Sequence, residues 1–142
     1  MSTRWEFDHI GNYNFMVEIE GVTSGSFSEV SGLESETDII NFYDGNARLR
    51  KRPGPTKYTN IIFKRGFTNS EELWNWRKSV VDGTVNRKSG SIIILDESKQ
   101  EIMRYNFFEA WPCRWKSAVL DASDNGLIVE ELEISVEKIE RG

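Results

Sequence analysis

The segment TNSEELWNWRKSVVDG, residues 68–83, predicts the one α-helix around which the rest of the chain is arranged. Thr68 and Glu71 have the spacing of a capping box, although Asn69 and Ser70 are rival caps. Apolar side chains recur along one face at helical spacing, and a glycine follows the segment as a left-handed stop. We therefore predict a single helix here, with strands before and after it.

Two tryptophans are the largest side chains of this helix. Trp74 and Trp76 most simply anchor it to a sheet, and stacking against a ligand is the alternative. Two glutamates lie in the first turn, whereas arginine and lysine come later, an order that suits the helix dipole. The helix is therefore expected to flank a sheet and to keep charged groups on its exposed side.

Alternation between apolar and polar residues predicts strands on both sides of the helix. Residues 13–20 and 127–139 alternate over most of their length, and the isoleucine run at 92–94 suggests a strand covered on both faces. The segment 34–43 is more polar, with Glu36 and Asp38 on one face, so that one side of this strand should face water. We count about seven or eight strands, a mainly β fold in one domain covering residues 1–142.

A basic segment follows the polar strand. Residues 44–57, DGNARLRKRPGPTK, are predicted to form a long loop that gathers Arg48, Arg50, Lys51 and Arg52. A loop of this length inside a compact domain is usually functional or disordered. It could be a solvated flexible loop, a docking loop for an acidic partner surface or, least favoured because no aromatic side chains are interleaved with the charges, a contact to nucleic acid.

The N-terminal residues 1–11 are predicted to form a polar arm. Trp5 and Phe7 are large apolar side chains on this arm. On a free arm they would be exposed, which suggests that they dock on something. Folding back on their own domain is the alternative.

Composition limits the classes of function. The chain has 142 residues, a net charge of -5 and 38% hydrophobic residues, which suits one globular domain and disfavours nonspecific nucleic-acid binding. No apolar run approaches membrane-spanning length and the N-terminus has no signal-peptide core, so we expect assembly in a cytoplasm. The single Cys113 permits no internal disulfide, and the single His9 makes a catalytic triad a poor hypothesis.

Motifs for chemistry are missing from the sequence. There is no glycine-rich phosphate loop and no cluster of residues with metal-ligand spacing, so we expect neither an enzyme nor a cofactor. Polar-faced strands, a basic loop and an aromatic arm instead favour a chain that meets other chains. A monomeric β-barrel with a ligand cavity and an enzyme that gathers His9 with a carboxylate are the rival hypotheses.

Several motifs, taken together and in order, resemble those of a known family. They are GNYNFMVEIEGV, SGSFSEVSGLESETD, PGPTKYTNIIFKRG, LWNWRKSVVDG, RYNFFEAWPCRW and VEELEISVEKIERG, and they span residues 11–142. The chain resembles the tail tube proteins of contractile phages, and most of all the inner-tube proteins of extracellular contractile injection systems. Each motif alone is weak, but their order and joint presence make the resemblance specific.

The resemblance implies a fold and a mechanical function. It implies an antiparallel β-barrel or sandwich with one flanking helix, the phage tail tube fold. Six copies would form a ring, and rings would stack into a hollow tube that a contracting sheath drives through a target envelope. The expected partners are further copies of the chain, sheath, baseplate and cap or terminator proteins, and possible protein cargo in the lumen.

The resemblance also implies roles for the residues singled out above. The basic loop 44–57 would reach the adjacent ring, and the arm would dock Trp5 and Phe7 at the same junction. Glu36 and Asp38 are the candidates for the wall of the channel. The residues expected to face the sheath are Glu71, Glu72, Arg77 and Lys78.

Overall fold

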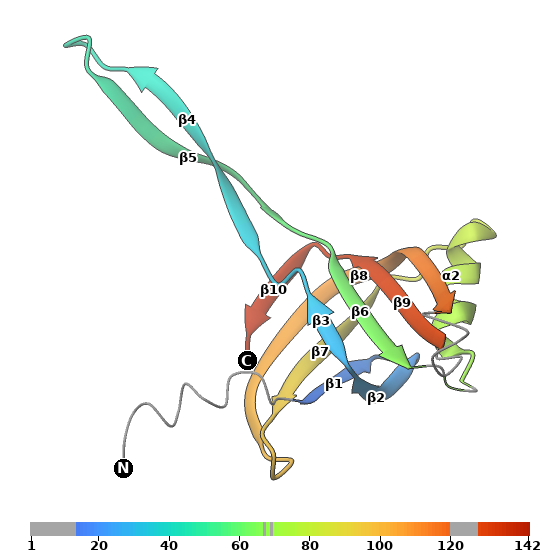
Figure 1. Ribbon diagram of the computed structural model, residues 1–142. Coiled ribbons are helices and arrows are strands. Elements are labelled where there is room, and N and C mark those ends of the chain that lie inside the picture. Colours follow the sequence, from blue (N-terminus) through green and yellow to red (C-terminus); the bar gives the residue numbers. More distant parts are fainter. Residues whose placement is uncertain (1–13, 67, 69, 120–127) are drawn as a thin grey trace, which may run out of the picture.

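The computed structural model describes residues 14–66, 68, 70–119 and 128–142, and this part of the chain is mainly β with one helix (Figure 1). In chain order the elements are β1 Asn14–Ile19, β2 Thr23–Phe27, β3 Glu29–Ser31, β4 Ser35–Tyr43, β5 Leu49–Tyr58, β6 Ile61–Gly66, α2 Glu72–Val81, β7 Lys88–Leu95, β8 Glu101–Val119, β9 Ile128–Ser135 and β10 Lys138–Arg141. The predicted fold class, mainly β with one flanking helix, is confirmed.

Eight strands form one antiparallel sheet and two form another. The larger sheet has the order β2-β1-β7-β8-β9-β6-β3, with β10 paired to β8, and the smaller sheet is the hairpin of β4 and β5. The chain passes directly from β2 to β3 at opposite ends of the larger sheet. There the backbone N–H of Ser28 donates to the carbonyl oxygen of Lys64 at 2.8 Å. The sheet therefore curls around a single core.

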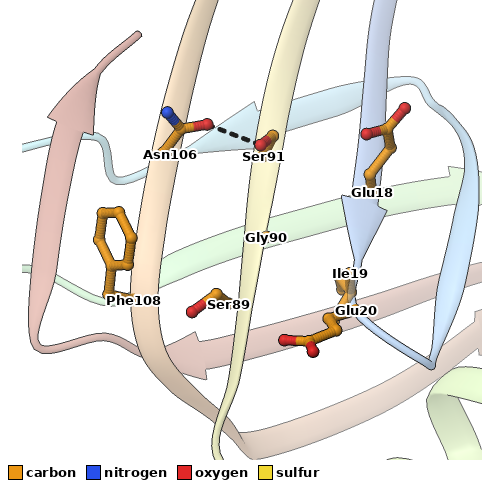
Figure 2. A pocket seen from close by; sticks show the side chains of 8 residues that line it. All are labelled: Glu18, Ile19, Glu20, Ser89, Gly90, Ser91, Asn106 and Phe108. Atoms are coloured by element: carbon orange, nitrogen blue, oxygen red, sulfur yellow. Dashed lines mark hydrogen bonds between the residues drawn. The ribbon is translucent and has the colours of Figure 1, made fainter.

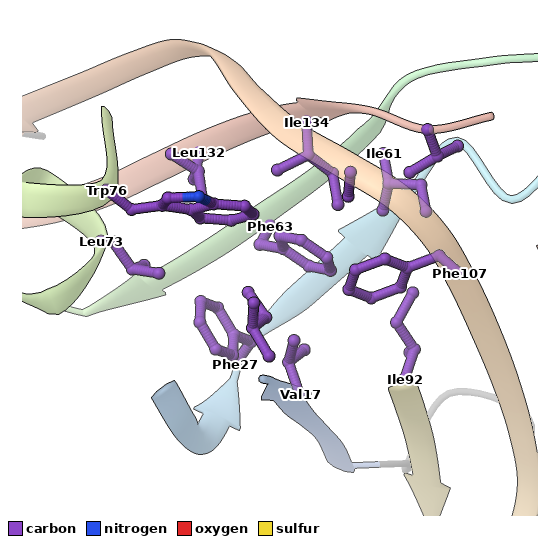
Figure 3. Close-up of a cluster of buried hydrophobic side chains, with 13 residues drawn as sticks. Val17, Phe27, Ile61, Phe63, Leu73, Trp76, Ile92, Phe107, Leu132 and Ile134 are labelled. Carbon is purple, nitrogen blue, oxygen red and sulfur yellow. The ribbon is translucent and has the colours of Figure 1, made fainter. Parts of the chain in front are cut away.

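The core is filled by alternate side chains of the strands and by two side chains of α2 (Figure 3). Phe63 of β6 lies between two other rings, with centroids 5.6 Å from Phe27 and 6.3 Å from Phe107. Leu73 and Trp76 bring the helix into the same cluster. The helix is thus fixed by burial of one face, which is how most helices in proteins are stabilised.

Gly90 of β7 allows a close approach inside this packing. A Cβ atom at this position would collide with the carbonyl oxygen of Glu18 and with the ring of Phe107. Only glycine leaves room for the ring to fill the space under the strand. The pairing of β1 with β7 and the position of Phe107 therefore depend on one missing side chain.

Strand β8 is longer than the sequence suggested. The sequence pattern predicts two segments, residues 101–108 and 109–116, but they form one strand that pairs first with β7 and β10 and then with β9. Glu109 has a φ of 55°, and the register shifts near it and again between Pro112 and Arg114. A proline inside a strand predicts an edge or a bulge, and the register shift beside Pro112 agrees with the second of these. These irregularities bend the strand without ending it.

The start of the helix differs from the prediction. Thr68 and Glu71 do not form a capping box: Glu71 is the N-cap and makes no side-chain capping hydrogen bond. The Thr68 hydroxyl instead accepts the backbone N–H of Ser70 at 3.2 Å in a local turn. The end agrees with the prediction, since Gly83 follows the helix with a φ of 95°.

The segment 44–57 is not a long loop, and this prediction was wrong. Only a short turn separates β4 from β5, and the two strands pair from Ser35↔Tyr58 to Tyr43↔Leu49. The carboxylate of Asp44 accepts the backbone N–H groups of Asn46 and Arg48, which closes the turn. Because the backbone of the basic segment is used in strand pairing, its side chains lie along a ribbon.

The last predicted strand, residues 127–139, is divided into β9 and β10. The backbone N–H of Glu137 donates to the carbonyl oxygen of Phe108 at 3.1 Å, at the point where the chain leaves β9. Beyond it, β10 pairs with the first half of β8. The alternation in the sequence continues across the break, which is why the sequence did not predict it.

Candidate assembly interface

The hairpin of β4 and β5 extends away from the barrel (Figure 1). Almost all of its side chains are exposed, and it is a separate two-stranded sheet. A two-stranded ribbon alone is marginally stable in water, so a hairpin of this length needs further contacts to be fixed in place. It is therefore the first candidate for an interface.

Three exposed apolar side chains share one face of the hairpin, with the Asn41–Lys51 pair between them. Residues directly opposite each other in an antiparallel pair share a face, as Tyr43 and Leu49 do. Ile39 lies on the same face by strand alternation, and the three side chains are 66%, 73% and 50% exposed in the order Ile39, Tyr43 and Leu49. We call these three residues the apolar stripe. Exposed apolar groups gathered in this way mark an interaction surface.

The four predicted basic residues all lie toward the far end of the hairpin. Arg50 lies 3.6 Å from the carboxylate of Asp44, and Arg52 lies over the ring of Phe42 at 5.6 Å. In the part of the chain that the structure describes, Arg48 and Lys51 form no ion pair. The structure thus brings the predicted cluster together and leaves positive charge beside the apolar stripe.

Glu36 and Asp38 lie in β4, near the root of the hairpin, and both are exposed. Glu36 is opposite Lys57 in the register, and a carboxylate oxygen of Asp38 lies 3.8 Å from Nζ of the same lysine. The register shifts between Thr37 and Ile39, which interrupts the regular alternation on which the expectation of a shared face was based. Both side chains are nevertheless exposed to water, as expected for one side of this strand.

The charged residues of α2 are not equivalent. Glu71, Glu72 and Lys78 are exposed, whereas Arg77 is half-buried and donates from Nη1 to the carbonyl oxygen of Pro112 at 3.1 Å. Arg77 therefore ties the helix to β8 and has less freedom to meet a partner. The other three remain available on the surface.

The two tryptophans of α2 also have different roles. Trp76 is buried and donates its indole N–H to the carbonyl oxygen of Asn86 at 3.1 Å, as an anchor should. Trp74 is 44% exposed and packs edge-on against Trp115 of β8, with centroids 4.7 Å apart. Both tryptophans therefore help to hold the helix on the barrel, as expected, but only Trp76 is buried.

A buried ion pair lies beside Trp115, and we did not predict it from the sequence. Nε of Arg65 donates to Oε1 of Glu130 at 2.9 Å, and Trp115 donates its indole N–H to the other carboxylate oxygen at 3.0 Å. The guanidinium also lies over the ring of Phe27. The signal was present, because strand alternation places Glu130 on the same face as Leu132, which is fully buried.

Cys113 has no catalytic surroundings. Its thiol is half-buried and donates to the carbonyl oxygen of Glu133 at 3.5 Å. Burial, followed by the nearby charge of Glu133, raises the pKa of the Cys113 thiol and so disfavours the reactive thiolate. The aromatic arm residues Trp5 and Phe7 and the single His9 lie outside the described residues.

A depression of the surface over the larger sheet is open (Figure 2). It has a volume of about 540 Å³ and lies over β1, β7 and β8, with Glu18 and Glu20 along one side. Ser91 and Asn106 share a hydrogen bond of 2.6 Å on its floor. Among the described residues there is no group of side chains suited to a metal ion, and no helix is long and apolar enough to cross a membrane. The lining surface of this depression is more apolar than polar, and the residues that line it form no arrangement suited to catalysis.

Comparisons with known proteins agree with an assembly role. Residues 11–140 match the family model described as T4-like virus tail tube protein gp19. No curated protein sequence matches the chain.

Solved structures of contractile injection systems are also similar to this chain. A chain of the PVC sheath–tube complex of an extracellular contractile injection system, in the extended state, is 27% identical with a TM-score of 0.81, over 100% of this chain and 98% of that one. A chain of the PVC sheath/tube terminator is 28% identical with a TM-score of 0.78, over 90% and 92%. Hcp1 from Flavobacterium johnsoniae shares the fold, at 23% identity and a TM-score of 0.63, over 91% and 94%.

Proposed function

Because the chain belongs to the T4-like tail tube protein family, we propose that six copies form a ring and that rings stack into a hollow tube. Members of this family are structural components of phage tails or of extracellular contractile injection particles, and the chain is a tail tube protein rather than an enzyme. Beyond family membership, we propose that the ring is a hexamer, that the rings stack and that the tube acts mechanically. A contracting sheath drives the tube through a target envelope, and the lumen carries protein cargo.

The projecting hairpin is the observation that carries this proposal. A ribbon with an exposed apolar stripe and four basic side chains is poorly suited to a free monomer, because it leaves apolar surface in water. A neighbouring copy in the next ring covers the stripe. Acidic groups there meet the basic residues, and such complementarity sets register and partner choice more than affinity.

Strand edges support closure into a ring. In the described part of the chain β10 pairs with β8 alone, and β4 and β5 pair only with each other, so each has an edge with unused backbone groups. Such edges invite pairing with another chain. In a closed ring neighbouring copies supply the missing partners, and no edge is left to propagate aggregation.

The stacked-ring arrangement also assigns roles to the exposed residues of β4, to the N-terminal arm and to the helix. Glu36 and Asp38, both exposed, line the wet channel, and Trp5 and Phe7 of the arm dock at the ring junction. The exposed helix residues Glu71, Glu72 and Lys78 face the sheath. The similar chains of a sheath–tube complex and a tube terminator support sheath and terminator proteins as partners. Baseplate and cap proteins complete the set of partners in this proposal. Assembly takes place in the cytoplasm.

Electron microscopy of the purified protein tests the proposal. Negative-stain images and size-exclusion chromatography, over a range of protein concentrations, should show six-fold rings and stacked tubes. A protein that stays monomeric at every concentration would contradict the proposal. That result would favour the rival hypothesis, a monomeric β-barrel that binds a ligand.

A further inference from the structure

A pocket lies between the start of α2 and the second half of β8. It has a volume of about 350 Å³, and two indole rings, Trp74 and Trp115, form its apolar part. Glu71, Glu130 and three hydroxyl-bearing residues supply its polar part. Trp74 is the only tryptophan of the helix that reaches the surface here, because Trp76 points into the core.

The base of this pocket is held rigidly. Trp115 is tied to Glu130 by its indole N–H, and Glu130 is tied to Arg65 inside the barrel. Trp74 then packs edge-on against the fixed Trp115 ring. A pocket with this support loses little conformational freedom when a partner enters it, which favours binding.

The chemistry of the lining selects a cation. Its polar groups are carboxylates and hydroxyls, and none of the residues that line the pocket is basic. Glu71 is exposed and forms no ion pair within the described residues, so its negative charge is free to meet a partner. Exposed indole faces attract guanidinium and ammonium groups, and the aliphatic stem of arginine or lysine packs well against them.

We propose that this pocket receives an arginine or lysine side chain of the protein that encloses the tube. The inference rests on the proposed function for the existence of that protein and adds the site and its chemistry. Arginine fits best, because its planar guanidinium stacks on an indole while hydrogen bonding to a carboxylate. Contact through separate small pockets, rather than one continuous apolar face, also suits a sheath that must release the tube when it contracts.

Co-assembly with the sheath protein of the same particle tests this inference. Trp74→Ala and Glu71→Lys should leave rings and tubes unchanged in length and should reduce sheath binding by about tenfold per site, the size expected from a lost cation–π contact with its ion pair. Val81→Ala, an exposed apolar residue at the other end of the helix, is the matched control and should bind sheath normally. N-acetyl-argininamide should compete with sheath, and the glutamine analogue should not.

Each other outcome overturns the inference. If Trp74→Ala tubes bind sheath as the wild type does, or if both analogues compete equally, the pocket does not select a cation from the sheath. If Trp74→Ala or Glu71→Lys prevents tube formation while the protein remains folded, the pocket lies between copies of this chain. Failure of the proposed function is recognised separately, because the wild-type protein would then form no rings or tubes.

Discussion

Arg65 and Glu130 lie opposite each other on β6 and β9 and form an ion pair inside the barrel, with Nε and Oε1 2.9 Å apart and both side chains buried. The carboxylate has a second partner in Trp115, whereas Nη2 of Arg65 has no hydrogen-bond partner among the described residues. The pair is therefore only partly satisfied. Replacing both members of the pair should therefore change the stability of the protein less than replacing only one of them.

Replacing one member of this pair should be costly. Arg65→Met leaves the Glu130 carboxylate buried without its cation, and we expect the free energy of unfolding to fall by about 3 kcal/mol. The double substitution Arg65→Met, Glu130→Leu should recover most of this loss, because no buried charge remains. Urea denaturation followed by circular dichroism measures both. Equal losses in the single and double variants would contradict the interpretation.

A second prediction concerns the close approach at Gly90. Gly90→Ala forces a methyl group against Phe107 and the Glu18 carbonyl, and overpacking of this kind costs about 2 kcal/mol. Gly66→Ala is the control, because an added Cβ at this strand end meets nothing within 4 Å. Thermal unfolding of the two variants should differ clearly. Similar melting temperatures would show that β7 shifts to make room.

The elements that the sequence predicted correctly are those with a strong local signal. The helix within residues 68–83 has apolar residues at helical spacing, and the strand around residues 92–94 is marked by a continuous isoleucine run. The hairpin was missed for the opposite reason. Its second strand contains Pro53, Gly54 and Pro55, which are typical of a loop, and its pairing depends on a turn closed by Asp44.

The candidate site was harder to predict than the fold, because it depends more on contacts between distant parts of the chain. The sequence placed four basic residues together because they are neighbours in the chain, and the structure keeps them together. The pocket of Trp74 and Trp115 joins residues far apart in sequence, as does the Arg65–Glu130 pair beneath it. Strand register brings such residues together, and the register is fixed by bulges that no local pattern announces.

The apolar stripe of the hairpin should be needed for stacking. Tyr43→Ser together with Leu49→Ser removes exposed apolar surface that we assign to the ring junction, so rings should persist and long tubes should disappear. Folding stability should change by less than about 0.5 kcal/mol, as for other surface substitutions. Val85→Ser is the control, since it is exposed to a similar degree outside the hairpin. Tube lengths in electron micrographs decide the result.

Charge reversal on the hairpin should act on the same junction through electrostatics. Arg50→Glu with Arg52→Glu places negative charge where we expect acidic groups of the next ring, so tubes should shorten more than subunit folding suffers. Added salt should restore part of the length by screening the repulsion. Lys78→Glu with Lys116→Glu makes the same change in net charge away from the hairpin and should stack normally. Normal tubes from the hairpin variant would argue against its role.

Glu36 tests which surface lines the channel. It is exposed, and the nearby cation of Lys57 is already within 3.8 Å of Asp38, so Glu36→Gln removes a charge without uncovering a buried group. If Glu36 faces the lumen, Glu36→Gln tubes should assemble normally, and Glu36→Cys tubes should bind a maleimide gold label along their axis. Arg48→Cys, in the turn of the hairpin, is the comparison, because at a packed junction it should resist the label. Loss of assembly in Glu36→Gln would place this residue in a packed interface, and label on the outer wall would place the channel elsewhere.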